Sequence, residues 1–175
     1  MCEHKDEIYE HLKKKYSYNQ KIHVYKKALS NKNENAKFNF NRHNLTSSLS
    51  NLDPNNSYLK MKAKLFGTTS QGMIVDTKTI QTTTLFSVLE KENLETIDFL
   101  KVDREGHELQ VLQGMKEKIK TIKHLLVEFH NDEIYISYDP EFLHEYLISH
   151  NFKLIKKFKF PFTTWEDRLY TNLEK

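Results

Sequence analysis

The segment 97–114 constrains the fold of this chain more than any other stretch. It begins with a short apolar run, 97–102, whose length and β-branched residues predict a buried strand. Acidic residues and a glycine interrupt the run. Leu109, Leu112 and Met115 then recur at every third position, as on one face of a helix. The segment is therefore predicted to fold as a strand, a tight acidic turn and a helix.

Three carboxylates gather at this turn, those of Asp103, Glu105 and Glu108. In an open α/β sheet, ligands bind at the carboxyl ends of the strands, so the turn is a candidate functional site. Acids in the first turn of a helix are also favoured by the helix dipole, by about 0.3–1 kcal/mol each. This effect accounts for Glu105 and Glu108 without any function. It explains Asp103 less well, because Asp103 directly follows the strand.

Strands and helices alternate along the C-terminal half, which predicts an α/β fold with a mainly parallel sheet. The length of 175 residues fits one domain spanning 1–175. The segment 41–72 lacks a period and is expected to be a long loop with a helical turn near 57–63. Helices are expected around Ile8 and Leu12, after Thr84 and after Asp139; further strands are expected at 22–25, 38–40, 77–84, 123–129, 152–160 and 168–170.

Composition and charge exclude several classes of protein. The net charge of +3 does not by itself indicate a nucleic-acid or membrane partner. The single cysteine, Cys2, rules out an internal disulfide framework. No apolar run approaches the roughly 20 residues that span a bilayer, and the polar sequence from Glu3 onward is unlike a signal peptide. We therefore expect a soluble, cytoplasmic protein without a membrane or nucleic-acid partner.

The segment 97–114 closely resembles the central signature of the FkbM family of methyltransferases. That signature is an Ile-Asp-x-Leu-Lys-Ile-Asp-x-Glu-Gly-x-Glu core followed by an apolar helix and a glycine. The flanking sequence agrees with it. Four further elements resemble the family in order along the chain: an Ala-Leu-Ser turn at 28–30, a Ser-Ser-Leu element at 46–49, a Thr-Leu helix start at 83–85 with Phe86 where an acid is usual, and a closing strand at 126–128.

The resemblance implies an S-adenosylmethionine-dependent O-methyltransferase on a Rossmann-like class I sheet. Its acceptor would be a hydroxyl group of a sugar, a polyketide or a similar small molecule. By position, Glu3 matches the acid at the end of the family's second strand, which binds the ribose hydroxyls of the cofactor. Ala28 and Leu29 would border the adenine. Asp103, at the end of the fourth strand, would face both the methyl group of the cofactor and the incoming oxygen.

Methyl transfer to an alcohol also requires a base, for which a carboxylate or an imidazole is suited. We expect Asp103 to be this base, with His107 as the second candidate. Glu105 and Glu128 are within plausible reach of the same space. The alternative for His107 is a partly exposed residue of the first helical turn without a catalytic role.

One feature departs from the family pattern. The family has a glycine-rich loop between its first strand and first helix, whereas the first glycine of this chain is Gly67. Such loops use glycine so that the backbone can approach the cofactor. We therefore expect a partial domain that lacks the family's first strand and glycine-rich loop. The alternative function is a non-catalytic remnant or binding module of the same fold.

Two other patterns have ordinary explanations. Cys2, His4 and His11 lack the fourth partner and the spacing of a metal site, so no metal ion is expected there or elsewhere. The lysines and aromatic residues of 153–165 are the types that form a nucleic-acid surface. Their alternation is also that of a strand with aromatic side chains facing inward and lysines in water, which is the interpretation we favour.

Overall fold

The segment 97–114 folds as a strand, a turn and a helix, as its pattern predicts. The computed structural model describes residues 1–3, 5–42, 47–161 and 163–175. In it, strand β6 (Ile97–Val102) is followed by a turn and helix α4 (Glu108–Gln113). His4 and Thr46, which belong to patterns discussed above, lie outside the described residues.

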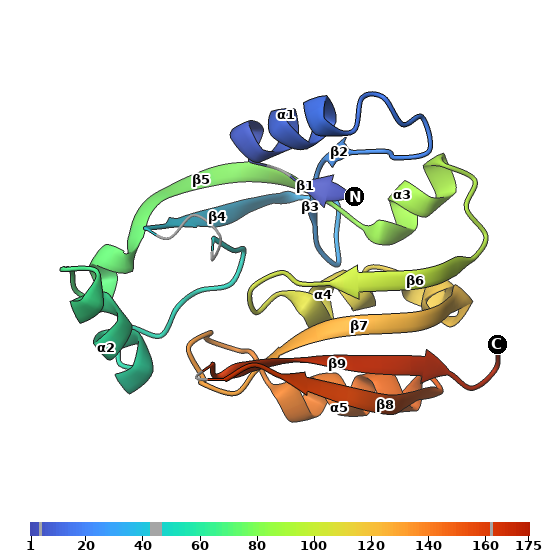
Figure 1. The fold of residues 1–175 in the computed structure, drawn as a ribbon. Helices are drawn as coiled ribbons and strands as arrows, with labels where there is room; N and C mark the ends of the chain where they lie inside the picture. The colour runs from blue at the N-terminus through green and yellow to red at the C-terminus, as the bar shows by residue number, and fades with distance from the viewer. Residues whose placement is uncertain (4, 43–46, 162) are drawn as a thin grey trace.

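Strand β6 belongs to a four-stranded sheet with the order β6-β7-β9-β8 (Figure 1). Strand β7 (Ile122–His130) is parallel to β6. Strand β9 (Trp165–Asn172) lies between β7 and β8 (Phe152–Lys159) and is antiparallel to both. Because β6 and β7 are parallel neighbours, their carboxyl ends meet at one edge of the sheet.

The remaining strands form two smaller sheets, drawn above the first in Figure 1. Strand β5 (Ile74–Thr83) lies between β3 (Ala28–Leu29), which is parallel to it, and β4 (Asn35–Asn41), which is antiparallel. Strands β1 (Cys2–Glu3) and β2 (Tyr25–Lys26) form a short parallel pair.

Several helices begin at a side chain that caps their free backbone N–H groups. Thr84 Oγ1 accepts a hydrogen bond from Ser87 N at 3.0 Å, as the sequence predicts. Asp139 Oδ1 accepts from the N–H groups of Glu141 and Phe142, both at 3.0 Å. Besides α4, the helices are α1 (Asp6–Lys15), α2 (Ser57–Leu65), α3 (Leu85–Lys91), α5 (Pro140–Ser149) and two 3₁₀ turns, η2 (Gln71–Met73) and η3 (Lys116–Thr121).

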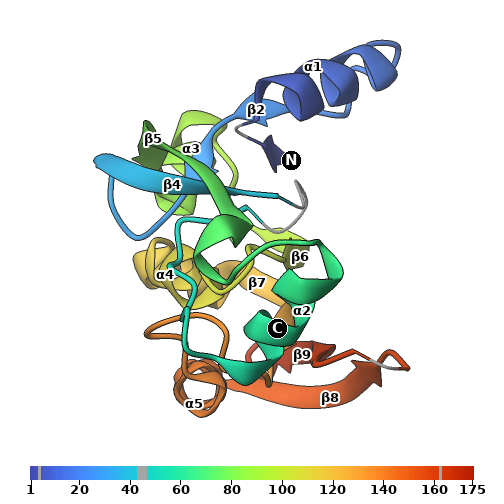
Figure 2. The same cartoon turned by 90° about the vertical axis from the view of Figure 1, so that its left-hand side faces the viewer.

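The helices are not distributed evenly around the four-stranded sheet. Figures 1 and 2 place α4 and α5 on the same face of this sheet and α2 beyond the carboxyl ends of β6 and β7. Helices α1 and α5 lie at opposite ends of the molecule in both views. No helix in the described part of the chain is long and apolar enough to cross a membrane.

Two apolar clusters hold these layers together. The main core joins the four-stranded sheet to α3, α4 and α5, and its fully buried members include Leu112, Leu125 and Leu143. A smaller second core lies around α2 and includes Leu59 and Tyr135. Tyr135, from the loop after β7, also contacts the acidic turn through a hydrogen bond to Glu105.

The α/β class is confirmed, but the prediction of a mainly parallel sheet is wrong. Three of the six strand pairings in the described residues are parallel and three are antiparallel. Strands β8 and β9 are joined by a short link, 160–164, whereas a parallel return needs a crossover of a dozen or more residues. The short link therefore makes this pair antiparallel.

Three predictions about shorter segments also need correction. The strand expected at 22–25 contains only Tyr25 and continues to Lys26, because its partner β1 offers only two residues for pairing. Ala28 and Leu29 form strand β3 against β5 rather than part of a turn. The strand expected at 38–40 is longer than predicted, since it forms β4 (Asn35–Asn41), and it pairs with β5, which lies far along the sequence.

Candidate functional site

The acidic turn after β6 adopts a backbone conformation that few residues tolerate. Glu105 has φ +55° and Gly106 has φ +83°, both in the left-handed region. A Cβ atom on Gly106 would lie 2.4 Å from Cγ of Tyr135, so glycine is required there for space as well as for conformation. A non-glycine residue at positive φ, such as Glu105, persists only where its surroundings hold it.

Hydrogen bonds to the main chain hold this turn. Ser48 Oγ donates to the carbonyl oxygen of Glu105 at 2.7 Å, and Ser50 Oγ donates to that of Gly106 at 2.7 Å. From the other side, Glu108 Oε1 accepts from the N–H groups of Arg104 at 2.7 Å and Gly106 at 3.3 Å. Glu108 is completely buried, and burial raises its pKa to about 7. Glu108 therefore has a structural role in closing the turn.

His107 connects the turn to two distant parts of the chain. Its Nε2 lies 3.0 Å from Oγ of Ser30, directly after β3, and its Nδ1 lies 3.5 Å from Oγ of Ser50. Burial lowers the pKa of His107 to about 4, with the nearby Arg104 charge contributing. The imidazole is therefore neutral at pH 7, and both of its nitrogens face serine hydroxyls. This arrangement favours a structural role for His107.

Glu105, Glu128 and His130 bring their side chains together at the carboxyl ends of β6 and β7; we call them the Glu–His cluster. One carboxylate oxygen from each glutamate and one ring nitrogen of the histidine all lie within 4.8 Å of one another. Glu128 Oε2 is 3.2 Å from His130 Nε2. Tyr135 donates a short hydrogen bond of 2.5 Å from its hydroxyl to Glu105 Oε2.

Burial dominates the electrostatics of this cluster. It raises the pKa of Glu105 and that of Glu128, and the neighbouring Asp103 carboxylate raises the pKa of Glu128 further. Burial alone would lower the pKa of His130, but Glu128 and the other nearby carboxylates outweigh it and raise this pKa to about 9. The site therefore combines carboxyl groups whose charge is disfavoured by burial with a His130 imidazole whose protonated, positive form is favoured by those carboxyl groups.

Asp103 differs from the other acids of the site in being accessible. Its side chain is 42% exposed, and its Oδ2 lies 2.9 Å from Nζ of Lys101. It also neighbours Glu128 and, through charge repulsion, raises the pKa of Asp167 on β9, which burial raises first. Asp103 is thus more exposed than Glu105, Glu108 and Glu128.

Besides Asp103, the three residues expected to bind the cofactor lie in different environments. Glu3 ends β1, as expected, and its Oε1 accepts a hydrogen bond from the N–H of Lys5 at 2.9 Å. The Lys5 ammonium interacts electrostatically with both Glu3 and Glu105, so the end of β1 lies near the acidic turn. Ala28 is buried against a cavity, whereas Leu29 belongs to the main core.

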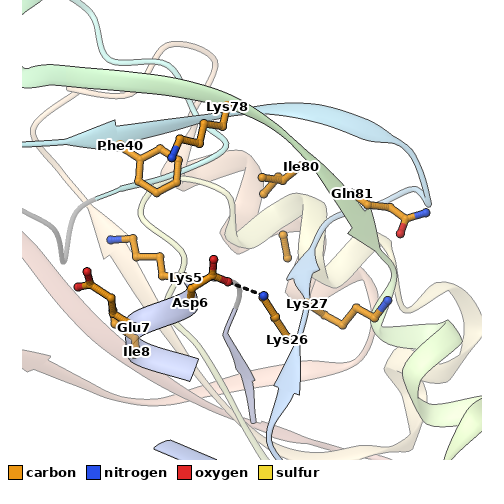
Figure 3. A pocket seen from close by; sticks show the side chains of 11 residues that line it. Lys5, Asp6, Glu7, Ile8, Lys26, Lys27, Phe40, Lys78, Ile80 and Gln81 are labelled. Carbon is orange, nitrogen blue, oxygen red and sulfur yellow. Dashed lines mark ion pairs between the residues drawn. The ribbon is translucent and has the colours of Figure 1, made fainter. Parts of the chain in front are cut away.

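This cavity has a volume of about 590 Å³ and lies between α1, β2 and the pair β4–β5 (Figure 3). Four lysines and two acids line it, and one of these lysines, Lys26, forms an ion pair with Asp6. Lys78 lies over the ring of Phe40, 5.3 Å from its centre. The excess of lysine side chains suits an anionic group rather than a cation.

The family of the chain follows from a comparison with family models. The model of the methyltransferase FkbM domain matches residues 1–154. The chain belongs to the FkbM methyltransferase family. The resemblance noted in segment 97–114 is thereby confirmed. No curated protein and no solved structure matches the chain.

In this FkbM domain, sequence reasoning missed two residues of the site. His130 lies two positions after Glu128 on β7, so both side chains share one face of a strand; this alternation is a signal that the sequence contained. Tyr135 belongs to the loop after β7 and left no such signal. Asp103, Glu105 and His107, which form one contiguous motif, lie together at the turn.

Proposed function

We propose that this FkbM domain transfers a methyl group from S-adenosylmethionine to a hydroxyl group of a small molecule such as a sugar or a polyketide. The observation that carries the proposal is the accessible Asp103 carboxylate, which stands at the carboxyl end of β6 beside buried acids. When bound, S-adenosylmethionine supplies an electrophilic methyl group on a positively charged sulfonium. A positive centre fits a site beside the exposed Asp103 carboxylate.

The candidate cofactor residues suit different parts of this molecule. The Glu3 carboxylate has two acceptor oxygens, a suitable arrangement for a pair of ribose hydroxyls. Ala28 has the small side chain that a flat adenine ring can approach. Leu29 would support Ala28 from the main core. The lysine-lined cavity is a poor place for the sulfonium because of its charge, so we assign the sulfonium to the acidic turn.

Asp103 is the proposed general base. As the acceptor oxygen formed its bond to the methyl carbon, the bond from this carbon to the sulfonium sulfur would break, releasing S-adenosylhomocysteine, and the Asp103 carboxylate would take the proton of the acceptor hydroxyl. General bases of this kind contribute typically 10²- to 10⁴-fold. Most of the remaining rate enhancement comes from holding oxygen and methyl group in line at short distance. His107, with a pKa of about 4 and two serine partners, is a weak base that instead positions the turn. Glu105 supports the charge of the site.

Two measurements on the 175-residue chain test this function. Calorimetry with S-adenosylmethionine tests cofactor binding, which the proposed function requires in spite of the missing glycine-rich loop. Transfer of a radiolabelled methyl group to a panel of sugars and polyketide alcohols then tests catalysis. We expect Asp103→Asn to lower transfer by about 100-fold or more with the fold retained, because Asp103 is exposed.

A matched control is Asp98→Asn, which removes an exposed acid from the same strand. This variant should transfer at the wild-type rate. Full activity in Asp103→Asn would remove Asp103 from the mechanism. Absence of cofactor binding by the 175-residue chain would contradict the proposed activity and favour the alternative, a non-catalytic binding module of the same fold.

A further inference from the structure

We propose that the Glu–His cluster, formed by Glu105, Glu128 and His130, binds a divalent ion of the first transition series. Its three candidate ligand atoms already lie within 4.8 Å of one another. A single ion bonded to all three requires them to surround one point at about 2.0–2.2 Å, which this spacing allows with small side-chain movements.

Rigid elements present these ligands. Glu128 and His130 lie two residues apart on β7, so they project from the same face of the strand. Glu105 lies on the turn that follows β6, and β6 is hydrogen-bonded to β7 with Val102 opposite Val127. The bonds from Ser48 and Glu108 to the turn fix the backbone around Glu105. The cluster is thus built on neighbouring strand ends, not on exposed loop side chains.

A second observation also points to a ligand at the cluster. Glu128 and His130 are more than nine-tenths buried, with relative exposures of 7% and 4%. Among the described residues, Glu128 Oε2 and His130 Nε2 form an ion pair at 3.2 Å, and neither atom has a hydrogen-bond partner apart from this contact. Buried polar atoms in proteins are nearly always satisfied. A metal ion between the two atoms would satisfy both.

The donor set indicates the kind of ion. Carboxylate oxygens suit Mg²⁺, Ca²⁺ and Mn²⁺, whereas imidazole suits Zn²⁺, Fe²⁺ and heavier ions. Two carboxylates with one imidazole therefore favour Mn²⁺ or Zn²⁺ over Mg²⁺, which prefers oxygen ligands alone. The hydroxyl of Tyr135 would orient Glu105, as hydrogen-bond partners of ligating carboxylates commonly do.

Three protein ligands leave coordination positions open to a water molecule or an alcohol. Asp103 interacts with Glu128, one of the proposed ligands. An alcohol oxygen bound to the metal becomes more acidic, so its proton would pass more readily to Asp103. This consequence rests on the proposed function, whereas metal binding itself does not.

The competing explanation is a protonated His130 that balances Glu128 without any metal. Titration of the 175-residue chain with Mn²⁺, followed by electron paramagnetic resonance of the free ion, separates the two. We expect one Mn²⁺ per chain, a similar stoichiometry for Zn²⁺ by calorimetry, and weaker binding of Mg²⁺. Failure of both Mn²⁺ and Zn²⁺ to bind would overturn the proposal and leave the protonated histidine.

Variants locate the ion within the chain. Glu128→Gln and His130→Asn should each weaken Mn²⁺ binding by at least about 10- to 100-fold, the loss typical of disturbing even the partners of metal ligands. Because both positions are buried, Glu105→Gln at a half-buried position provides a third test if either variant unfolds. Asp98→Asn, an exposed acid on β6, should bind Mn²⁺ as the wild type does.

Unchanged Mn²⁺ affinity in folded Glu105→Gln would also overturn the proposal. Circular dichroism establishes that each variant is folded. The metal titrations contain no S-adenosylmethionine and no acceptor, so their outcome is independent of methyl transfer. A chain that binds the cofactor but no metal contradicts only this inference, and a chain that binds Mn²⁺ but no cofactor contradicts only the proposed function.

Discussion

Two constraints act on Gly106, a left-handed backbone and a lack of space for a Cβ atom, whereas only the first acts on Gly67. At Gly106, φ is +83° and an added Cβ would meet the Tyr135 ring; at Gly67, φ is +64° and an added Cβ would meet nothing within 4 Å. Alanine at either position adopts a left-handed conformation at a cost of about 1–2 kcal/mol. At Gly106 it also displaces Tyr135, which adds about 1–3 kcal/mol of overpacking.

We therefore expect Gly106→Ala to lower the free energy of unfolding by more than Gly67→Ala, as measured by urea denaturation. Gly106→Ala should also disturb the Tyr135–Glu105 hydrogen bond and so weaken Mn²⁺ binding, whereas Gly67→Ala should not. Equal losses of stability in the two variants would mean that Tyr135 moves aside without cost.

His107 should make stability depend on pH in the acidic range. Its pKa is about 4 in the folded chain and about 6.5 when unfolded, so the unfolded state takes up a proton first as the pH falls. Its contribution to stability is fully present above pH 6.5 and is lost as the pH falls towards 4. At about 1.4 kcal/mol per pKa unit, this loss reaches about 2–3 kcal/mol at pH 4.5.

His107→Gln removes this titration while keeping a side chain that can hydrogen-bond to Ser30. We expect the variant to be less stable than the wild type at pH 7 and the gap to shrink as the pH falls to 4.5. Urea denaturation of both proteins at the two pH values measures the gap. A gap that stays constant would show that His107 keeps its unfolded-state pKa.

At the scale of elements, the sequence predicted best what local signals determine. Helix α5 begins at the Asp139-Pro140 pair and α3 begins at Thr84, because a cap acts within three residues of its helix. Strand β6 and helix α4 were predicted from a short apolar run and a three-residue period. Each of these signals lies inside or beside the element that it specifies.

Strand pairing depended on partners that no local pattern reveals. The segment 22–25 alternates like a strand, yet pairing occurs only where β1 offers an edge. Strand β4 lies in the sheet because β5, more than thirty residues later, hydrogen-bonds to it. Local sequence patterns also failed to reveal the contacts of the candidate site that join distant segments. Asp103 and Glu105 belong to one contiguous motif, but Tyr135 reaches Glu105 from another loop.

At the scale of the whole molecule, two cores of unequal size support the site. The main core spans the four-stranded sheet and three helices, whereas the second core is small and includes both Leu59 of α2 and Tyr135. Small cooperative units open locally at lower free energy than the main core. A mutation in the second core should therefore disturb the Glu–His cluster even when the mutated residue does not contact it.

Leu59→Ala and Leu143→Ala test this difference, since both side chains are almost fully buried, one in each core. Each truncation should cost about 2–5 kcal/mol where the surrounding structure is intact. We expect Leu59→Ala to accelerate amide exchange in α2 and in 131–138 and to weaken Mn²⁺ binding. We expect Leu143→Ala to lower global stability while leaving Mn²⁺ affinity unchanged. Uniform acceleration of exchange in both variants would indicate a single cooperative core.

The bonds that hold the acidic turn have a consequence for how such a site changes over generations. Ser48, Ser50 and Glu108 bind peptide groups of the turn, and the side chain of Asp103 takes no part in those bonds. A substitution at position 103 should therefore leave the shape of the turn intact, so this position tolerates variation during evolution without loss of the fold.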